Sequence, residues 1–176
     1  MSLSLAEILD QVDLSGHQFL ACFQGVSDEA WRRKPDPAAW SMEEIAEHVA
    51  IVEAQVRKLI LERMVTAPAT AELLAECAGK DELIERRMAD PAGRPAPEST
   101  QPRGRWATPA ELAQSFRGNR QRVLDFMRSS TVDSETHGWE HPAFGALTLR
   151  QWLFSQARHV ERHTVQMHRL AHSLQD

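Results

Sequence analysis

Histidines with metal-binding spacing are the residues of this sequence best suited to chemistry. The 176-residue chain contains eight histidines, and three pairs have i, i+4 spacing: His137/His141, His159/His163 and His168/His172. On an α-helix this spacing stacks two imidazoles on one face, where they can share one metal ion. Spacing alone does not choose between the pairs, so the choice depends on the face that each pair occupies.

A helical projection separates the three pairs. At about 100° per residue, His159 and His163 fall in or at the edge of the apolar stripe of the segment 149–173. The same projection places His168 and His172 on the opposite face, among charged side chains. The remaining pair is interrupted by a glycine and followed by a proline, so it need not be helical. We therefore expect His159 and His163 to point into the protein.

His48 is the candidate for a third ligand. It lies on the flank of the apolar stripe of the segment 42–65, from which it can meet His159 and His163. Imidazoles on an inner face cost free energy unless they are paired. Two interpretations stay open from the pattern: hydrogen-bonded core histidines, or three ligands from two helices that form an open metal site.

Two further polar residues lie at apolar positions of their segments. Glu53 is a candidate for an acceptor behind a ligand imidazole or for an acid–base group, and the alternative is a glutamate paired with an arginine. Asn119 could orient a ligand or substrate, and the alternative is a hydrogen-bonded core amide. Gln156 and Gln166 lie near the inner histidines and could bond a metal-bound water, or else face solvent or pair along the helix.

Helix-capping motifs predict the elements that position these side chains. A capping box is Ser or Thr followed three residues later by Glu or Gln. It occurs at Ser4…Glu7, Ser41…Glu44, Thr108…Glu111 and Thr148…Gln151. Apolar residues with helical spacing follow each box. This combination predicts four long helices, at about residues 4–24, 42–65, 109–130 and 149–173.

The long connection between the second and third helices sets the expected topology. It contains short helical pieces at Ala71–Cys77 and Asp81–Ala89, separated by Gly79, and then the proline-rich stretch 91–97. A connection of this length allows the helices 42–65 and 109–130 to run parallel. The segment 129–146 is expected to be a loop, and no strand is predicted. The expected fold is an all-α four-helix bundle in a single domain, residues 1–176.

Composition limits the function classes. The chain is 42% hydrophobic and 26% charged with a net charge of −5, which argues against a general nucleic-acid-binding protein. No apolar run approaches the length of a membrane span, and the N-terminus does not resemble a signal peptide. Two cysteines cannot form a disulfide framework on their own, so a cytoplasmic protein is expected.

Two stretches of this sequence resemble the signatures of the DinB/YfiT-like superfamily. The first runs Trp40-Ser41-Met42-x-x-Ile45-x-x-His48 and is followed by Glu53. The second runs His141-Pro142-x-Phe144-Gly145-x-Leu147-Thr148-x-x-x-Trp152-Leu153 and continues as His159-x-x-x-His163-x-x-Gln166. The resemblance implies a four-helix bundle that holds a divalent metal, nickel or zinc, on His48, His159 and His163.

The resemblance does not imply a single reaction. Related members include S-transferases that use bacillithiol, isomerases that use mycothiol, domains of ergothioneine synthesis and proteins described as metal-dependent hydrolases. It implies a metal-dependent enzyme, either a thiol-dependent S-transferase with a low-molecular-weight thiol as co-substrate or a hydrolase of a small substrate. The alternative is a non-catalytic, stress-linked bundle that binds a metal or ligand. A homodimer is left open as the assembly.

Overall fold

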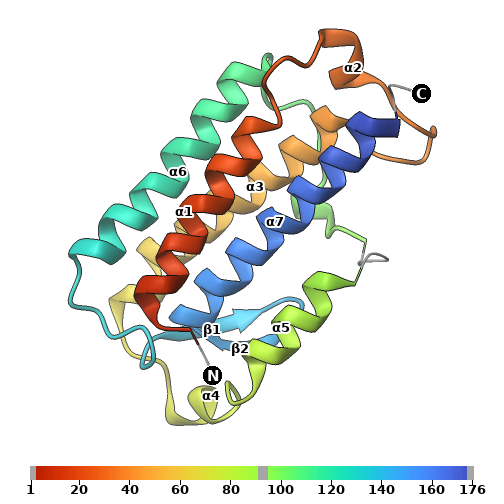
Figure 1. Cartoon of the computed structure of the whole chain (residues 1–176). Helices are drawn as coiled ribbons and strands as arrows, with labels where there is room; N and C mark the ends of the chain where they lie inside the picture. Colours follow the sequence, from red (N-terminus) through yellow and green to blue (C-terminus); the bar gives the residue numbers. More distant parts are fainter. Residues whose placement is uncertain (1–2, 91–94, 174–176) are drawn as a thin grey trace.

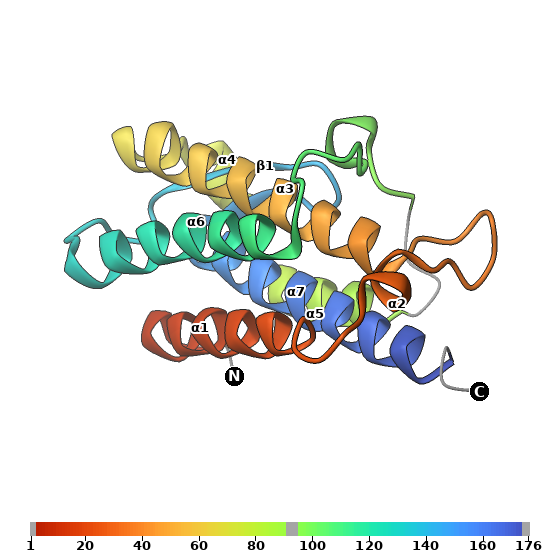
Figure 2. The ribbon, with the colours of Figure 1, turned by 90° about the horizontal axis from the view of Figure 1, so that it is seen from above.

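Four long helices form the body of the protein in the computed structural model, which describes residues 3–90 and 95–173. They are α1 (Leu5–Ala21), α3 (Met42–Glu62), α6 (Pro109–Ser129) and α7 (Leu149–Ser173). Helix α1 packs against α7, and α3 packs against α6 (Figures 1 and 2). The chain runs in one direction through α1 and α7 and in the other through α3 and α6 (Figure 1). The four-helix bundle and its parallel second and third long helices are therefore confirmed.

The predicted capping motifs begin these helices. Reciprocal side-chain and backbone bonds form at three of the four sites: Ser4/Glu7, Ser41/Glu44 and Thr148/Gln151. At α6 the Thr108 side chain accepts from the backbone N–H of Glu111, but the Glu111 carboxylate reaches Ala107, one residue before the cap. Each site satisfies backbone donors that the first helical turn leaves without a partner.

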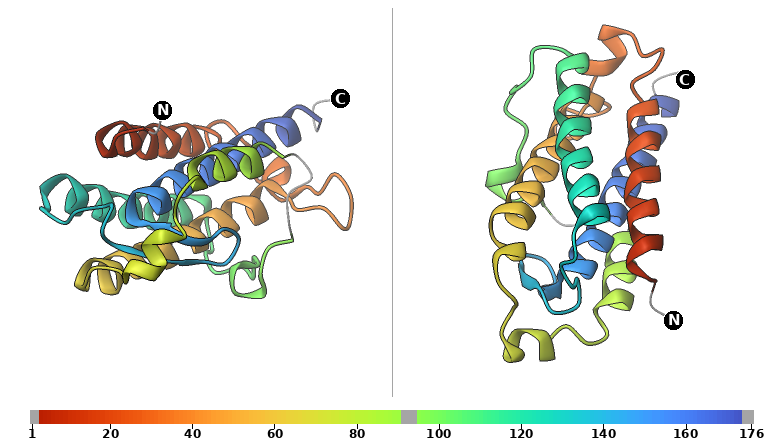
Figure 3. Two further views of the ribbon diagram at one scale, coloured as in Figure 1. Left: turned by 90° about the horizontal axis from the view of Figure 1, so that it is seen from below. Right: turned by 90° about the vertical axis from the view of Figure 1, so that its left-hand side faces the viewer.

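The long connection carries short elements and runs back along the bundle. It contains the 3₁₀ turn Met64–Thr66, α4 (Ala71–Ala75), α5 (Lys80–Ala89) and the 3₁₀ turn Glu98–Thr100. Helix α5 lies alongside α7, and residues 95–108 lead to the start of α6 (Figure 3). Residues 91–94 of the proline-rich stretch lie outside the described residues, and 95–97 are not helical. This path brings Thr100 beside α3.

A two-stranded hairpin and a short helix were missed from the sequence. The expectation of no strand was wrong, because β1 (Gly138–His141) pairs antiparallel with β2 (Gly145–Thr148) in a small hairpin. Strands of four residues are too short to show a period-two pattern. Glycine makes the hairpin possible, because a Cβ at Gly138 would lie 2.6 Å from the Leu147 carbonyl oxygen. The other missed element is the short helix α2 (Asp28–Arg32).

The apolar core lies between the four long helices. Its largest fully buried side chains include Phe19, Phe116, Ile45, Ile60 and Leu149. The inward-facing apolar stripes that the sequence predicted for α1, α3, α6 and α7 supply most of these contacts. Among the described residues, no helix combines the length and the apolar character that crossing a membrane would need.

Candidate metal centre

Three histidine side chains meet between α3 and α7. His48 comes from α3, and His159 and His163 come from successive turns of α7. One ring nitrogen from each lies within 4.8 Å of the others, and the Nε2 atoms of His48 and His159 are 3.2 Å apart. The i, i+4 spacing brings the two α7 rings to a centroid distance of 4.6 Å. These are the three histidines that the sequence analysis named as metal ligands.

Hydrogen bonds hold two of the imidazoles with Nε2 unprotonated. His48 Nδ1 is 2.9 Å from the Thr100 carbonyl oxygen, and His163 Nδ1 is 2.8 Å from Gln166 Oε1. Both oxygens can only accept, so each Nδ1 carries the proton and donates it. Each Nε2 is then left with a lone pair, as a metal ligand requires. Such bonds behind ligand histidines fix the tautomer and the ring orientation.

Burial keeps all three imidazoles neutral near pH 7. It lowers the pKa of His163 to about 3, with a further contribution from the neighbouring His48. The pKa of His159 is held well below its usual value by burial and by the two other histidines. For His48, burial lowers the pKa against the opposing effect of the bond to Thr100. A divalent cation binds neutral imidazole, so these histidines do not have to lose a charge-bearing proton before they bind a metal at neutral pH.

The cluster has no carboxylate or thiolate among its ligand atoms, and one of its nitrogens has no partner. His159 Nδ1 is buried and makes no hydrogen bond to any described residue. Neutral nitrogen donors of this kind suit zinc, nickel, copper or iron better than magnesium or calcium. The donor set therefore fits the divalent transition metal that the sequence analysis expected.

A buried ion pair lies beside the histidines. Glu53 of α3 receives two bonds from the Arg120 guanidinium, of 3.1 and 2.7 Å, and one of 2.7 Å from the Gln156 amide. Both charged side chains are about 5% exposed or less. Arg120 also donates to the Val12 carbonyl and to the Ser15 hydroxyl of α1. The network therefore links all four long helices.

Arg120 is the residue of this region that the sequence analysis missed. The alternative for Glu53, pairing with an arginine, is the arrangement that the structure has. The sequence signal for a large neighbouring side chain was Gly16, a glycine on the inner face of α1. In the structure, a Cβ at this position would lie 2.8 Å from Arg120 Cδ. By contrast, the neighbouring Asn119 amide donates to the Ser115 carbonyl within its own helix and joins neither the ion pair nor the histidine cluster.

The other histidine pairs lie elsewhere. His168 and His172 are exposed, as the projection predicted, and His168 Nε2 is 3.5 Å from the Cys22 sulfur. His137 precedes β1 and bonds the Asp133 carbonyl. His141 ends β1, and its ring packs against Trp152 at a centroid distance of 4.4 Å. Of the three pairs, one alone contributes to the cluster.

Outside the cluster, His141 gives a test of acid sensitivity. Burial lowers its pKa to about 4, whereas an unfolded histidine titrates near 6.5. Between these values the unfolded chain binds a proton that the folded chain does not, so stability falls as the pH falls. We expect the H141N variant to lose up to about 1.4 kcal/mol per pH unit of this slope. Its amide oxygen can still accept from the Ala143 N–H, as Nδ1 does.

Urea unfolding with a chelator present, followed from pH 7 to pH 4, measures that slope. The matched control is H172N, which changes an exposed histidine and should give the wild-type slope. Parallel stability curves for wild type and H141N would contradict the assignment of a depressed pKa to His141.

Comparison with known proteins identifies the family of this chain. A sequence model of the DinB superfamily matches residues 11–167, which is most of the chain. The chain belongs to the DinB superfamily. The predicted resemblance is thereby confirmed at the level of the family.

Two further comparisons show what this member of the DinB superfamily is similar to. The uncharacterized protein YuaE of Bacillus subtilis is 26% identical over 145 residues, which cover 82% of this chain and 85% of YuaE. The solved structure of YfiT from Bacillus subtilis is described as a probable metal-dependent hydrolase with an unusual four-helix bundle topology. It aligns with a TM-score of 0.64 and 13% identity, over 99% of this chain and 91% of YfiT. At that identity, the likeness to YfiT establishes the fold alone.

Proposed function

We propose that this protein is a metal-dependent enzyme whose divalent ion, zinc or nickel, is held by His48, His159 and His163. The observation that carries the proposal is the convergence of three neutral imidazole nitrogens within 4.8 Å. Three protein ligands are typical of catalytic sites, whereas structural zinc sites usually have four. A divalent ion there would supply the Lewis acidity that lowers the pKa of a water or a thiol.

The residues around the ligands supply orientation. Thr100 and Gln166 hold the rings of His48 and His163 by their Nδ1 protons, so that neither ring must reorganise when it binds. The oxygens of Glu53 are already engaged by Arg120 and Gln156, which favours a positioning role for Glu53 over that of a free acid or base. The buried pair of Glu53 and Arg120 also fixes the spacing between α3 and α6, and His48 lies on α3.

We propose a small-molecule substrate and one of two reactions, transfer of a low-molecular-weight thiol to an electrophile or hydrolysis of a small substrate. The description of YfiT as a probable metal-dependent hydrolase supports the second, and the known thiol-using reactions of the family support the first. The two differ in whether turnover requires a thiol.

Assays of protein purified without a chelating tag distinguish these reactions. Turnover of an electrophile that requires added bacillithiol or mycothiol would identify an S-transferase, and turnover of activated esters without thiol would identify a hydrolase. In either case, removal of the metal should lower the rate at least about tenfold, and zinc or nickel should restore it. Turnover that is unchanged by complete metal removal would contradict the metal-dependent mechanism. A metal-loaded protein without either activity would favour the binding-module alternative.

A further inference from the structure

Glu47 is a buried carboxylate of α3 that makes no contact with the cluster of histidine nitrogens. The residue is 3% exposed and immediately precedes the ligand His48 in the chain. Successive helical residues project about 100° apart, so its side chain leaves α3 on a different side from the His48 ring. A buried carboxylate costs free energy unless it is hydrogen-bonded, so the partners of Glu47 indicate what its burial achieves.

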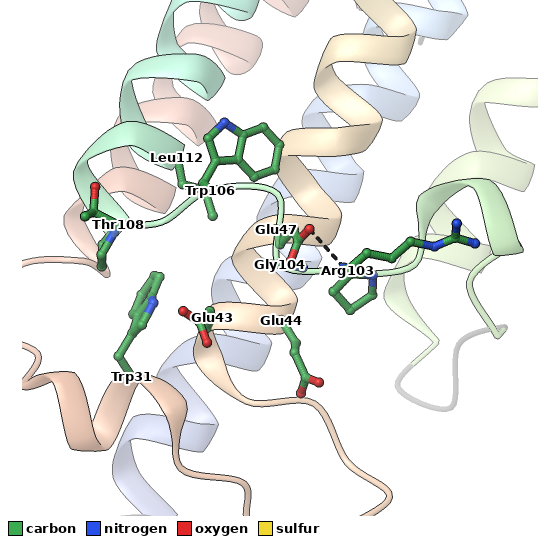
Figure 4. A pocket seen from close by; sticks show the side chains of 11 residues that line it. Trp31, Glu43, Glu44, Glu47, Arg103, Gly104, Trp106, Thr108 and Leu112 are labelled. Carbon is green, nitrogen blue, oxygen red and sulfur yellow. Dashed lines mark hydrogen bonds between the residues drawn. The ribbon is translucent and has the colours of Figure 1, made fainter.

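The partners of Glu47 are three consecutive backbone N–H groups of the long connection. Its Oε1 accepts from Arg103 and Arg105 and its Oε2 accepts from Gly104, each at 2.9 Å. Figure 4 views the cavity that Glu47 and Gly104 line, and it shows the carboxylate turned toward this segment. Gly104 has a φ of +71°, which costs glycine little and lets neighbouring N–H groups converge on one anion. Glu47 therefore holds residues 103–105 against α3.

The segment that Glu47 holds continues directly from the hydrogen-bond partner of His48. The Thr100 carbonyl lies three residues before the held N–H groups, and it accepts from His48 Nδ1 at 2.9 Å. A second contact from α3 to this stretch is weaker, because the exposed Gln55 amide donates to the Ser99 carbonyl at 3.0 Å without a charge. Hydrogen bonds to a carboxylate are roughly twice as strong as neutral ones. Glu47 is thus the main side chain of α3 that places the Thr100 carbonyl.

The Thr100 carbonyl decides which nitrogen of His48 is free for a metal. A carbonyl oxygen can only accept, so it holds the proton on Nδ1 and leaves a lone pair on Nε2. That lone pair lies 3.2 Å from His159 Nε2, so without a metal His159 donates its own proton there. His159 Nδ1 then carries a lone pair instead of a proton, which agrees with its being buried without a partner. The proton positions of both ligands follow from one carbonyl.

From these contacts we infer that Glu47 is a positioning residue of the metal centre, which acts through the segment 100–105 to keep Nε2 of His48 unprotonated. The inference rests on the proposed metal site, because it gives Glu47 a role in preparing one of the three ligands. A ligand whose proton already lies on the far nitrogen needs no rearrangement when it binds. Loss of a partner that fixes a ligand imidazole typically costs about 10–100-fold in metal affinity.

Histidine ¹⁵N NMR spectra of the metal-free protein test this inference, because protonated and unprotonated ring nitrogens have well-separated resonances. In the wild-type protein, His48 should carry its proton on Nδ1. In E47A, which removes all three bonds to residues 103–105, His48 should show both tautomers or a proton on Nε2. E47Q keeps one accepting oxygen, so its His48 should lie between these two cases. It provides the test if E47A does not fold.

Zinc affinity, measured by competition with a chelator, is the second readout. E47A should bind zinc about tenfold more weakly than the wild-type protein. The matched control is E43A, which removes a carboxylate one turn earlier on the same helix. Glu43 contacts the exposed Arg32 side chain at 3.6 Å instead of the long connection. E43A should therefore leave both the His48 tautomer and the zinc affinity unchanged.

Two results for His48 would overturn the inference. One is a wild-type His48 that is protonated on Nε2. The other is an unchanged Nδ1 proton in E47A, even if the variant is less stable, because Glu47 would then have a purely structural role. Equal changes in E47A and E43A would also contradict the inference. A wild-type protein that binds no zinc would contradict the proposed metal site, whereas the metal-free spectra would still decide for or against Glu47.

Discussion

The H159A variant should bind no divalent metal after purification, whereas the wild-type protein should bind about one ion per chain. His159 supplies the nitrogen that lies 3.2 Å from His48 Nε2, and its removal leaves two imidazoles. Two imidazoles rarely hold an ion against dilution, since stable sites use three or four ligands. Metal analysis by mass spectrometry after gel filtration measures the stoichiometry, and titration with zinc or nickel measures the affinity.

The double variant H168A/H172A is the matched control. It removes two histidines of the same spacing from the same helix, but from its exposed face. It should retain full stoichiometry, although it loses the contact between His168 and the Cys22 sulfur. Loss of metal in the double variant together with retention in H159A would show that the other face of α7 holds the ion.

The E53A variant should lose about 3–5 kcal/mol of unfolding free energy at pH 7, the range measured when one partner of a buried pair is removed. The substitution leaves the Arg120 guanidinium buried with acceptors from α1 but without its carboxylate. Since whole domains are stable by only about 5–15 kcal/mol, this loss is large. Urea unfolding followed by circular dichroism measures it.

An exposed ion pair between α6 and α1 provides the comparison. Arg128 of α6 contacts Asp13 of α1 at 3.1 Å, and the two side chains are 43% and 35% exposed. D13A should therefore cost less than about 1 kcal/mol. The variant E53L/R120M, which removes both charges, should recover part of the loss seen in E53A. Equal small losses in E53A and D13A would contradict the importance of burial.

Local sequence patterns were sufficient to predict the four long helices. The capping boxes and the 3.6-residue apolar period act within a few residues, so the starts of α1, α3, α6 and α7 could be predicted from neighbouring positions. The same local geometry separated His159 and His163 from the exposed pair His168/His172. The short elements could not be predicted this way: the hairpin strands have four residues each, and tertiary contacts select them.

The sequence by itself determined which histidines face inward, because helix phase is a property of one segment. Only the tertiary structure decided two further contacts of this region, namely Thr100 behind His48 and Arg120 paired with Glu53. The first of these contacts joins residues 52 positions apart and the second joins residues 67 apart. No local spacing encodes such a pairing. The pairing depends on how the segment that contains Thr100 lies against α3 and on how α6 packs beside α3. Because the charges of Glu53 and Arg120 are both buried, each of these two residues needs the other.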